Sequence, residues 1–406
     1  MKYVQLHIDS GKKRLPLIGK AMMAMMAVAD MLCVRNHSSV RMTEANVGIL
    51  SGFPNFRRGN FRAEPPEGSK KTYLWELDSQ IHMAVSPSPS FRLPVVQPPY
   101  PFRIGPGDRG LALGSCFADH IGRWLADGRL PLCVNPFGAL YNPASVVQAL
   151  ERLASGEPFR ESDLFEHNGL WHSFAHHSDF SGPDAAEVSR RIEMARAEGV
   201  RALREARYLM LTFGTAWVYE REGRPVANCH KLPARLFTRR RLTVDEIVEP
   251  LALLLERWPD RQTILTVSPV IHRGDGLVEN QLSKSTLILA AHRLAERFAG
   301  RVHYFPAYEI VTGELRDYRF YADDMCHPSS VAIEYIRRRF SESLLTVEAA
   351  ELVSAVGELR RAMEHRPLHP GGEEYAAFRQ TMRRRAEEAQ ARYPTADFSE
   401  ELQFFA

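Results

Sequence analysis

Apolar runs and helical patterns alternate along the chain from residue 110 onward. Short runs of branched and aromatic residues predict five strands, at residues 110–113, 130–135, 208–213, 263–268 and 302–305. Apolar residues recurring at helical spacing predict helices at residues 117–127, 144–153, 185–206, 244–257, 283–298 and 329–344. Strand–helix alternation with connections of this length predicts an α/β fold, in which helices cover both faces of a parallel sheet.

The pattern changes at two places along the chain. Residues 1–90 mix patches rich in serine, proline, glycine and charge with weakly patterned pieces, which predicts an extension that is poorly ordered or loosely docked. Residues 91–346 carry the strands and helices of the α/β domain. Residues 347–406 are charged and helical with a break at residues 366–372, so we expect a helical appendage packed on the domain or on a partner.

Composition narrows the class of protein. The chain has 406 residues and a formal net charge of +3, which indicates neither a nucleic acid nor an acidic membrane surface as partner. No apolar run is long enough to span a bilayer, so we expect no stable membrane insertion. Five cysteines without a CxxC pair argue against a disulfide framework and favour a reducing, cytoplasmic location. A basic segment at residues 12–14 and a Met/Ala-rich stretch at residues 21–29 keep export as the alternative.

The first predicted strand leads directly into a serine that begins a helix. Gly114 ends the apolar run of residues 111–113, Ser115 comes next, and Phe117 and Ile121 begin the helical pattern. The hydroxyl of Ser115 would then lie beside the first backbone N–H groups of a helix, where developing negative charge is favoured. Such a position suits a nucleophile, and it equally suits an ordinary N-cap serine.

Polar residues and glycines at the carboxyl ends of the predicted strands supply further parts of a site. These ends converge on one edge of a parallel sheet, where α/β folds bind ligands. In chain order, and including the turn before the last helix, the candidates are Asn135, Gly138, Gly214, His272, Asp324 and His327.

Ser115 and three of these residues predict the chemistry of a serine hydrolase. The hydroxyl of Ser115 needs a neighbouring base, which the imidazole of His327 can supply. Asp324, three residues before that histidine, would orient the imidazole and stabilise its cation. The backbone N–H groups of Ser115 and Gly138 are candidate donors to the oxyanion of a tetrahedral intermediate.

The string Gly114-Ser115-Cys116-Phe117-Ala118 resembles the motif that gives the GSCFA-domain family its name, a branch of the SGNH (GDSL-like) hydrolase superfamily. The resemblance runs from about residue 91 to residue 345, extends through residues 365–367, and does not include the first ninety residues. Further segments similar to the family follow in order: Asn135-Pro136-Phe137-Gly138, Phe213-Gly214-Thr215-Ala216-Trp217, Asn228-Cys229-His230-Lys231, Val267-Ser268-Pro269-Val270 and the Asp324/His327 pair.

The resemblance implies a fold and a set of roles. The fold is a three-layer α/β/α sandwich, and residues 91–346 form its hydrolase domain. Ser115 corresponds to the nucleophile, Asp324 and His327 complete the triad, and Gly138 corresponds to an oxyanion donor.

The chain departs from the superfamily pattern at one position. Ala216 stands where the third sequence block normally offers an asparagine that donates to the oxyanion. Asn228 is the candidate substitute, on the hypothesis that its loop, which also carries His230, folds over the site. Asn135 and Gly214 are further candidates for oxyanion or substrate binding.

The predicted function is hydrolysis of an oxygen ester, with an O-acylated glycan or a small-molecule ester as substrate. The reaction would pass through an acyl-Ser115 intermediate and need no metal or organic cofactor. An acyltransferase with the same triad and a non-catalytic carbohydrate- or partner-binding module are the alternatives. The acyl group, the alcohol portion and the oligomeric state are not predicted.

Sulfur and imidazole groups near the site leave two smaller alternatives open. Cys116 is an alternative nucleophile, and with Cys229 and Cys326 it would form part of a zinc site, although no standard ligand spacing is present. A second histidine cluster precedes the third predicted strand and suits a metal site, a substrate rim or a solvated loop. Its members are His172, His176 and His177.

Overall fold

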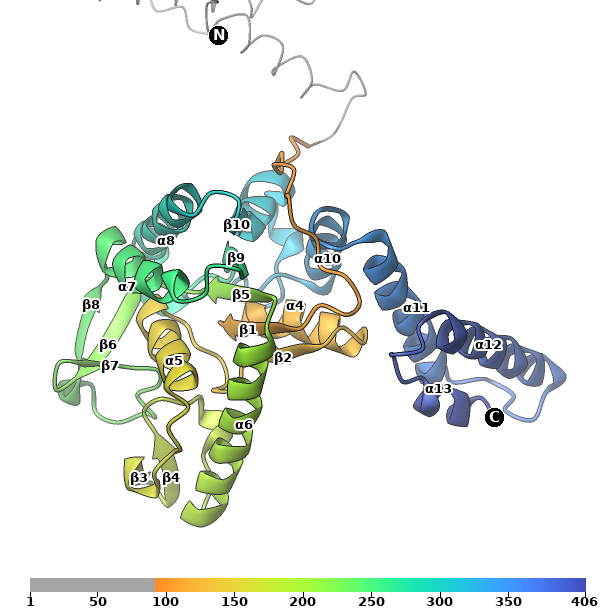
Figure 1. Ribbon diagram of the computed structural model, residues 1–406, viewed down its shortest axis with the longest axis horizontal. Coiled ribbons are helices and arrows are strands. Elements are labelled where there is room, and N and C mark those ends of the chain that lie inside the picture. The colour runs from red at the N-terminus through yellow and green to blue at the C-terminus, as the bar shows by residue number, and fades with distance from the viewer. Residues whose placement is uncertain (1–91) are drawn as a thin grey trace, which may run out of the picture. The chain divides into compact units, whose positions relative to one another are not determined.

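The computed structural model describes residues 92–406; the predicted extension at residues 1–90 lies outside the described part. The centre of this part is a five-stranded sheet in the order β10-β9-β5-β1-β2, with every neighbouring pair parallel (Figure 1). The strands are β1 (Gly110–Gly114), β2 (Leu132–Val134), β5 (Tyr208–Phe213), β9 (Gln262–Val267) and β10 (Val302–Phe305).

The two faces of the sheet belong to two hydrophobic cores. Ala112 of β1 enters one core, whereas its neighbours Leu111 and Leu113 enter the other. Met210 and Leu211 of β5 divide in the same way. Because side chains alternate along a strand, helices must cover both faces to bury such continuously apolar strands.

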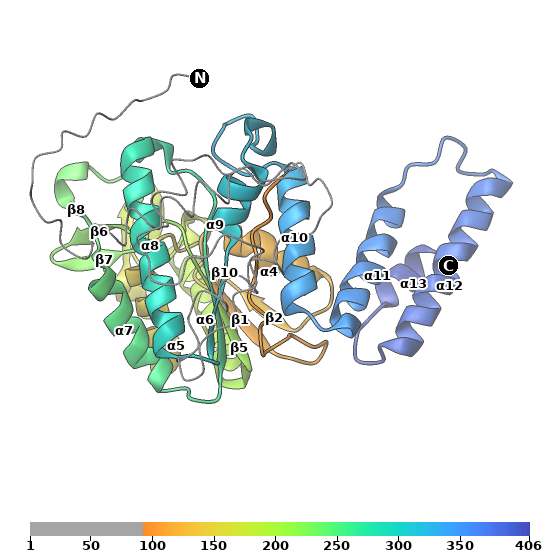
Figure 2. The same cartoon turned by 90° about the horizontal axis from the view of Figure 1, so that it is seen from above.

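Helices form the two outer layers, so the fold is the three-layer α/β/α sandwich. Figure 2 shows α4 and α10 on one side of the sheet and α5, α7 and α8 on the other. Their bounds are α4 (Cys116–Asp127), α5 (Pro143–Ser155), α6 (Ala185–Glu205), α7 (Val244–Glu256), α8 (Leu277–Arg297) and α10 (Ser330–Leu344). The predicted α/β class and parallel sheet are confirmed.

One helix starts well before its predicted position. The sequence pattern predicts a start at residue 283, but α8 begins at Leu277, directly after Gly276 with φ 76°. Leu277 and Val278 in the first turn are exposed, so apolar residues there do not mark the buried face of the helix. Asn280 lies in this missed part, and it contributes to the site described below.

Two small antiparallel sheets were not predicted. Their strands are short, partly exposed and in part strongly charged, so alternation of apolar and polar residues does not mark them. The hairpin consists of β3 (Leu164–His167) and β4 (Leu170–Ser173), and the other sheet of β6 (Trp217–Arg221), β7 (Arg224–Val226) and β8 (Thr238–Arg241). A short α9 (Ala307–Glu309) and a π-helical segment (Ile310–Leu315) follow β10.

The carboxyl-terminal residues form three helices that share the core of α4 and α10. They are α11 (Val347–Glu364), α12 (Glu373–Arg392) and α13 (Ser399–Phe404), so the expected break at residues 366–372 is present. Val353 packs against Gly128 at the end of α4. The guanidinium of Arg129 donates to Oε1 of the fully buried Glu401 at 2.6 Å. Across residues 92–406, no helix has both the length and the apolar character needed to cross a membrane.

Candidate active site

Ser115 lies between β1 and α4 and does not cap the helix. It occupies the N-cap position with φ −67° and ψ 176°, yet its side chain makes no capping hydrogen bond. The residue is 1% exposed, and its Oγ has no hydrogen-bond partner among the described residues. A buried hydroxyl without a partner is costly for stability, so the ordinary structural role of an N-cap serine does not explain this side chain.

The turn before Ser115 requires glycine. Gly114 has φ 147°, and a Cβ atom there would lie 2.1 Å from the carbonyl oxygen of Thr212 on β5. The same carbonyl accepts the backbone N–H of Ser115 at 3.1 Å. Close packing of β1 against β5 therefore fixes where the serine leaves the sheet.

Asp324 and His327 form a hydrogen-bonded pair on one turn. Nδ1 of His327 lies 2.5 Å from Oδ2 of Asp324, while Oδ1 accepts the backbone N–H groups of Cys326 and His327, both at 2.9 Å. These bonds to the backbone and ring of His327 hold the pKa of the Asp324 carboxyl well below its usual range. An ionised carboxylate on Nδ1 favours the tautomer in which Nε2 accepts a proton.

The Asp324–His327 turn lies at the amino-terminal end of α4. Nε2 of His327 is 4.0 Å from Sγ of Cys116, the residue after Ser115. The turn is fixed to the loop after β9, because the backbone N–H of Ile271 donates to the carbonyl of Cys326 at 3.0 Å. The structure thus places the Asp324–His327 pair beside the residue that follows Ser115, while the hydroxyl of Ser115 makes no hydrogen bond to His327 in this conformation.

The two backbone groups predicted as oxyanion donors are both engaged elsewhere. The N–H of Ser115 donates to Thr212, and the N–H of Gly138 donates to the carbonyl of Asn135 at 2.7 Å. In this conformation neither N–H group is free to donate to an oxyanion, because the packing of β1 on β5 and the turn after β2 provide acceptors for both. Asn135 offers the alternative: its Oδ1 accepts the N–H of Gly114 at 2.8 Å, and its Nδ2 is buried with no described partner.

Three buried polar residues on α8 organise the strand ends and were missed in the sequence. Asn280 accepts the backbone N–H of His272 at 3.0 Å, and Oγ of Ser283 accepts the N–H of Ala216 at 2.7 Å. Nζ of Lys284 donates to the carbonyls of Gly214 at 2.6 Å and Ser268 at 2.7 Å. The only sequence signal is their i, i+3, i+4 spacing on the apolar face of the helix.

Lys284 is fully buried close to the site. Burial lowers the pKa of its ammonium to about 7. A neutral amine has two hydrogens, which matches the two carbonyl acceptors that it contacts. Lys284 therefore holds the ends of β5 and β9 together, and no carboxylate among residues 92–406 forms an ion pair with it.

Family models match most of the described chain. A model described as the GSCFA family matches residues 109–340, and one described as GSCFA domain protein, C-terminal domain, matches residues 356–406. The chain belongs to the GSCFA family. Comparison with curated proteins and with solved structures gave no match.

Asn228 and His230 of this GSCFA protein take part in a different set of contacts. Oδ1 of Asn228 accepts the backbone N–H of His230 at 2.8 Å. Nε2 of His230 lies 2.8 Å from the carbonyl oxygen of Ser173, and its ring packs 4.6 Å from that of His172. Within the described residues no contact joins either side chain to Ser115, so the structure does not bring them to the predicted nucleophile.

The sulfur and histidine clusters show no ligand geometry for a metal in the part of the chain that the structure describes. No group of three or more His, Cys, Asp or Glu residues there is arranged to hold an ion. Cys116, Cys229 and Cys326 are free thiols. His176 packs on Phe137 and His172 bonds Ser181, so these two histidines have structural partners.

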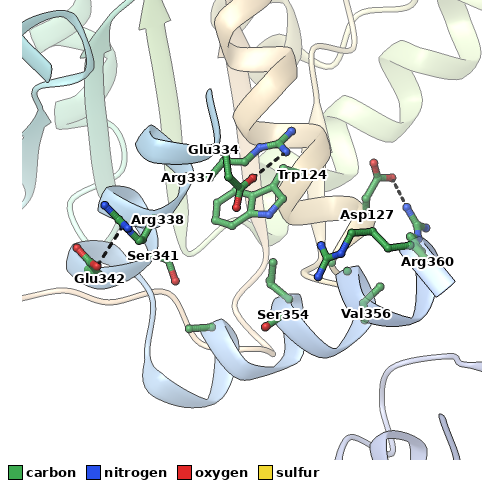
Figure 3. A pocket seen from close by; sticks show the side chains of 15 residues that line it. Trp124, Asp127, Glu334, Arg337, Arg338, Ser341, Glu342, Ser354, Val356 and Arg360 are labelled. Atoms are coloured by element: carbon green, nitrogen blue, oxygen red, sulfur yellow. Dashed lines mark ion pairs between the residues drawn. The ribbon is translucent and has the colours of Figure 1, made fainter. Parts of the chain in front are cut away.

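A separate cavity of about 460 Å³ lies between α4, α10 and α11 of the GSCFA protein. Figure 3 shows Trp124 in the wall of this cavity among three ion pairs, Arg337–Glu334, Arg338–Glu342 and Arg360–Asp127. Neither Ser115 nor His327 lines the cavity, which is therefore distinct from the candidate active site.

Proposed function

We propose that this GSCFA-family protein is a serine esterase of the SGNH type that cleaves an oxygen ester through an acyl-Ser115 intermediate. The observation that carries the proposal is the buried, unpartnered hydroxyl of Ser115 beside a turn that presents the Asp324–His327 pair. A nucleophile, a base and an orienting carboxylate are the parts that acyl transfer to serine requires. The order of the family motifs along the chain supports the same assignment.

The proposed reaction has two halves. Oγ of Ser115 attacks the ester carbonyl while Nε2 of His327 takes its proton, and Asp324 stabilises the imidazolium. The oxyanion intermediate collapses as His327 returns the proton to the leaving alcohol, which leaves the acyl group on Ser115. Water then attacks the acyl-enzyme and loses a proton to His327. The second tetrahedral intermediate collapses as His327 returns this proton to Oγ of Ser115, and the carboxylic acid leaves.

Donors for the oxyanion come from the turn after β2 and the start of α4. Nδ2 of Asn135 is the buried donor without a partner, and its carbonyl end is already fixed by Gly114. The first N–H groups of α4 and the helix dipole add to the favourable potential. A preorganised donor such as Asn135 stabilises charge that develops only in the transition state.

The contact between Cys116 and His327 favours a second candidate, in which the thiol is the nucleophile and a thioester is the intermediate. Sγ of Cys116 lies 4.0 Å from Nε2 of His327. However, burial and the neighbouring carboxylate of Asp119 raise the pKa of this thiol, and a thiol is a much weaker nucleophile than its thiolate. We therefore assign the nucleophile to Ser115.

Labelling with a fluorophosphonate probe tests the proposal. The wild-type protein should label and hydrolyse p-nitrophenyl acetate, and Ser115→Ala should do neither while keeping the wild-type melting temperature. Product that accumulates only when an acceptor alcohol is supplied would identify an acyltransferase. If the folded wild-type protein neither reacts with the probe nor hydrolyses the ester, the proposed esterase function is wrong and a binding module is favoured. Acetylated oligosaccharides, compared with simple aryl esters, test the proposed glycan substrate.

A further inference from the structure

His272 faces the nucleophile across a glycine. A Cβ atom at Gly214 would lie 3.2 Å from Cβ of Ser115 and 3.3 Å from Nε2 of His272. The space between these two side chains thus has no room for a larger residue at Gly214. His272 follows β9, and its loop also contacts the Asp324–His327 turn through Ile271 and Cys326.

Contacts of both its backbone and its ring position His272. The backbone N–H of His272 donates to Oδ1 of the buried Asn280 at 3.0 Å, and the imidazole ring meets the ring of Tyr141 edge-on, with centroids 6.2 Å apart. The ring approaches the backbone carbonyl of Gly214, a contact that by itself raises the pKa of the imidazole, and the same carbonyl accepts Nζ of Lys284 at 2.6 Å. Because the Gly214 carbonyl already accepts Lys284, a developing oxyanion beside the nucleophile would be the stronger acceptor for an imidazole N–H at this place.

The electrostatics of the site keep this imidazole neutral. Burial, and then the charge of Lys284, lower the pKa of His272 to about 4. At neutral pH the ring therefore carries one N–H donor and no charge. A general base works best with a pKa near the working pH, so this environment does not suit His272 as the base that activates Ser115.

We propose that His272 is a catalytic residue that donates an N–H to the oxyanion formed when Ser115 attacks its ester. It would replace the donor that the third sequence block lacks, since Ala216 is fully buried and has no polar side-chain atom. The hydrogen bond forms as the carbonyl oxygen gains charge, and no proton is transferred to or from His272. This assignment rests on the proposed esterase function.

Two variants at this position separate a donor from a base. His272→Ala removes the N–H and should lower kcat for p-nitrophenyl acetate about 100- to 1000-fold with little change in KM, which is typical of the loss of one oxyanion donor. His272→Gln keeps an N–H donor that does not titrate, and it should recover at least tenfold of the lost kcat. The acid limb of its pH profile should match the wild type. His292→Ala, at an exposed histidine on α8, is the matched control and should keep wild-type kcat.

The outcomes distinguish failure of this inference from failure of the proposed function. If Ser115→Ala abolishes turnover while His272→Ala stays within threefold of wild type, the donor role is wrong and the esterase stands. If His272→Gln loses activity as fully as His272→Ala, or loses the acid limb, the donor role is also wrong. If the wild type has no Ser115-dependent turnover, both the donor role of His272 and the proposed esterase function are wrong. Melting temperatures of all variants, with His272→Gln as the conservative change, exclude misfolding as the cause.

Discussion

Sγ of Cys116 lies 4.0 Å from Nε2 of His327, so the base of the proposed triad contacts the residue next to its nucleophile. Ser115 precedes this cysteine, and its hydroxyl is buried without a described partner. The proposed reaction requires the imidazole of His327, whose side chain is 49% exposed, to exchange its contact with Cys116 for one with the hydroxyl of Ser115. Catalytic hydrogen bonds are often long before substrate binds.

Replacement of Cys116 tests which neighbour reacts. Because the pKa of this thiol is raised mainly by burial, we expect Cys116→Ala to keep kcat within about fivefold of wild type. The measurement is the steady-state hydrolysis of p-nitrophenyl acetate together with fluorophosphonate labelling. Loss of turnover in Cys116→Ala with retention in Ser115→Ala would transfer the nucleophile to the thiol.

Replacement of Asp324 tests the orientation of the base. In Asp324→Asn an amide N–H would face Nδ1 of His327, which favours the wrong tautomer, and kcat should fall about 10⁴-fold. Asp323→Asn makes the same charge change at the adjacent exposed residue, so it should leave kcat nearly unchanged. Equal losses in both variants would indicate a general charge effect and contradict the triad.

The fold was largely predictable because its strands are unambiguous. Every residue of β1 and β5 is buried, so their apolar runs stand out from the helical patterns around them. The proposed catalytic residues could be selected for a related reason. Ser115 follows a strand and begins a helix, and Asp324 and His327 lie on the turn before α10, where chain order determines position in an α/β fold.

The donors around the site were not predictable from the same patterns. Whether a backbone N–H is free depends on tertiary contacts. The carbonyl oxygens of Thr212 and Asn135 accept the two N–H groups that the sequence predicts as oxyanion donors. The polar residues of α8 lie on a helix face that the sequence pattern assigns to the core. The sequence identifies His272 only as a strand-end histidine, because its approach to Ser115 depends on the absence of a side chain at Gly214.

Replacement of Gly138 tests the turn that carries Asn135. Gly138 has φ 72°, and a Cβ atom there would lie 2.4 Å from Cβ of His177, an atom that cannot move without the backbone. Gly138→Ala should destabilise the fold by about 3 kcal/mol, from left-handed strain and overpacking together. It should also lower kcat by displacing Asn135.

Gly156 is the matched control for this change. It caps α5 with φ 68°, but nothing lies within 4 Å of a Cβ atom built there. Gly156→Ala should therefore cost only the strain of about 1 kcal/mol and keep wild-type kcat. Urea unfolding measures both free energies; equal values for the two variants would contradict the predicted clash.

Lys284 predicts a specific pH dependence of stability. Burial lowers its pKa from 10.5 to about 7 in the folded protein. Between these two pH values the unfolded chain binds a proton that the folded chain does not, so the free energy of unfolding contributed by this group rises with pH. The slope is on the order of 1 kcal/mol per pH unit within that window, and it vanishes below pH 7, where both states are protonated.

Lys284→Met removes the titrating group while keeping an unbranched side chain. It leaves the carbonyls of Gly214 and Ser268 without their donor, so the variant should be less stable than wild type throughout. The difference in unfolding free energy between wild type and Lys284→Met should widen from pH 7 to pH 10, as measured by urea unfolding at each pH. Other groups that titrate in this range cancel in the difference. Lys231→Met removes one lysine charge at an exposed position and serves as the control, and a constant difference for Lys284→Met would contradict the lowered pKa of the buried amine.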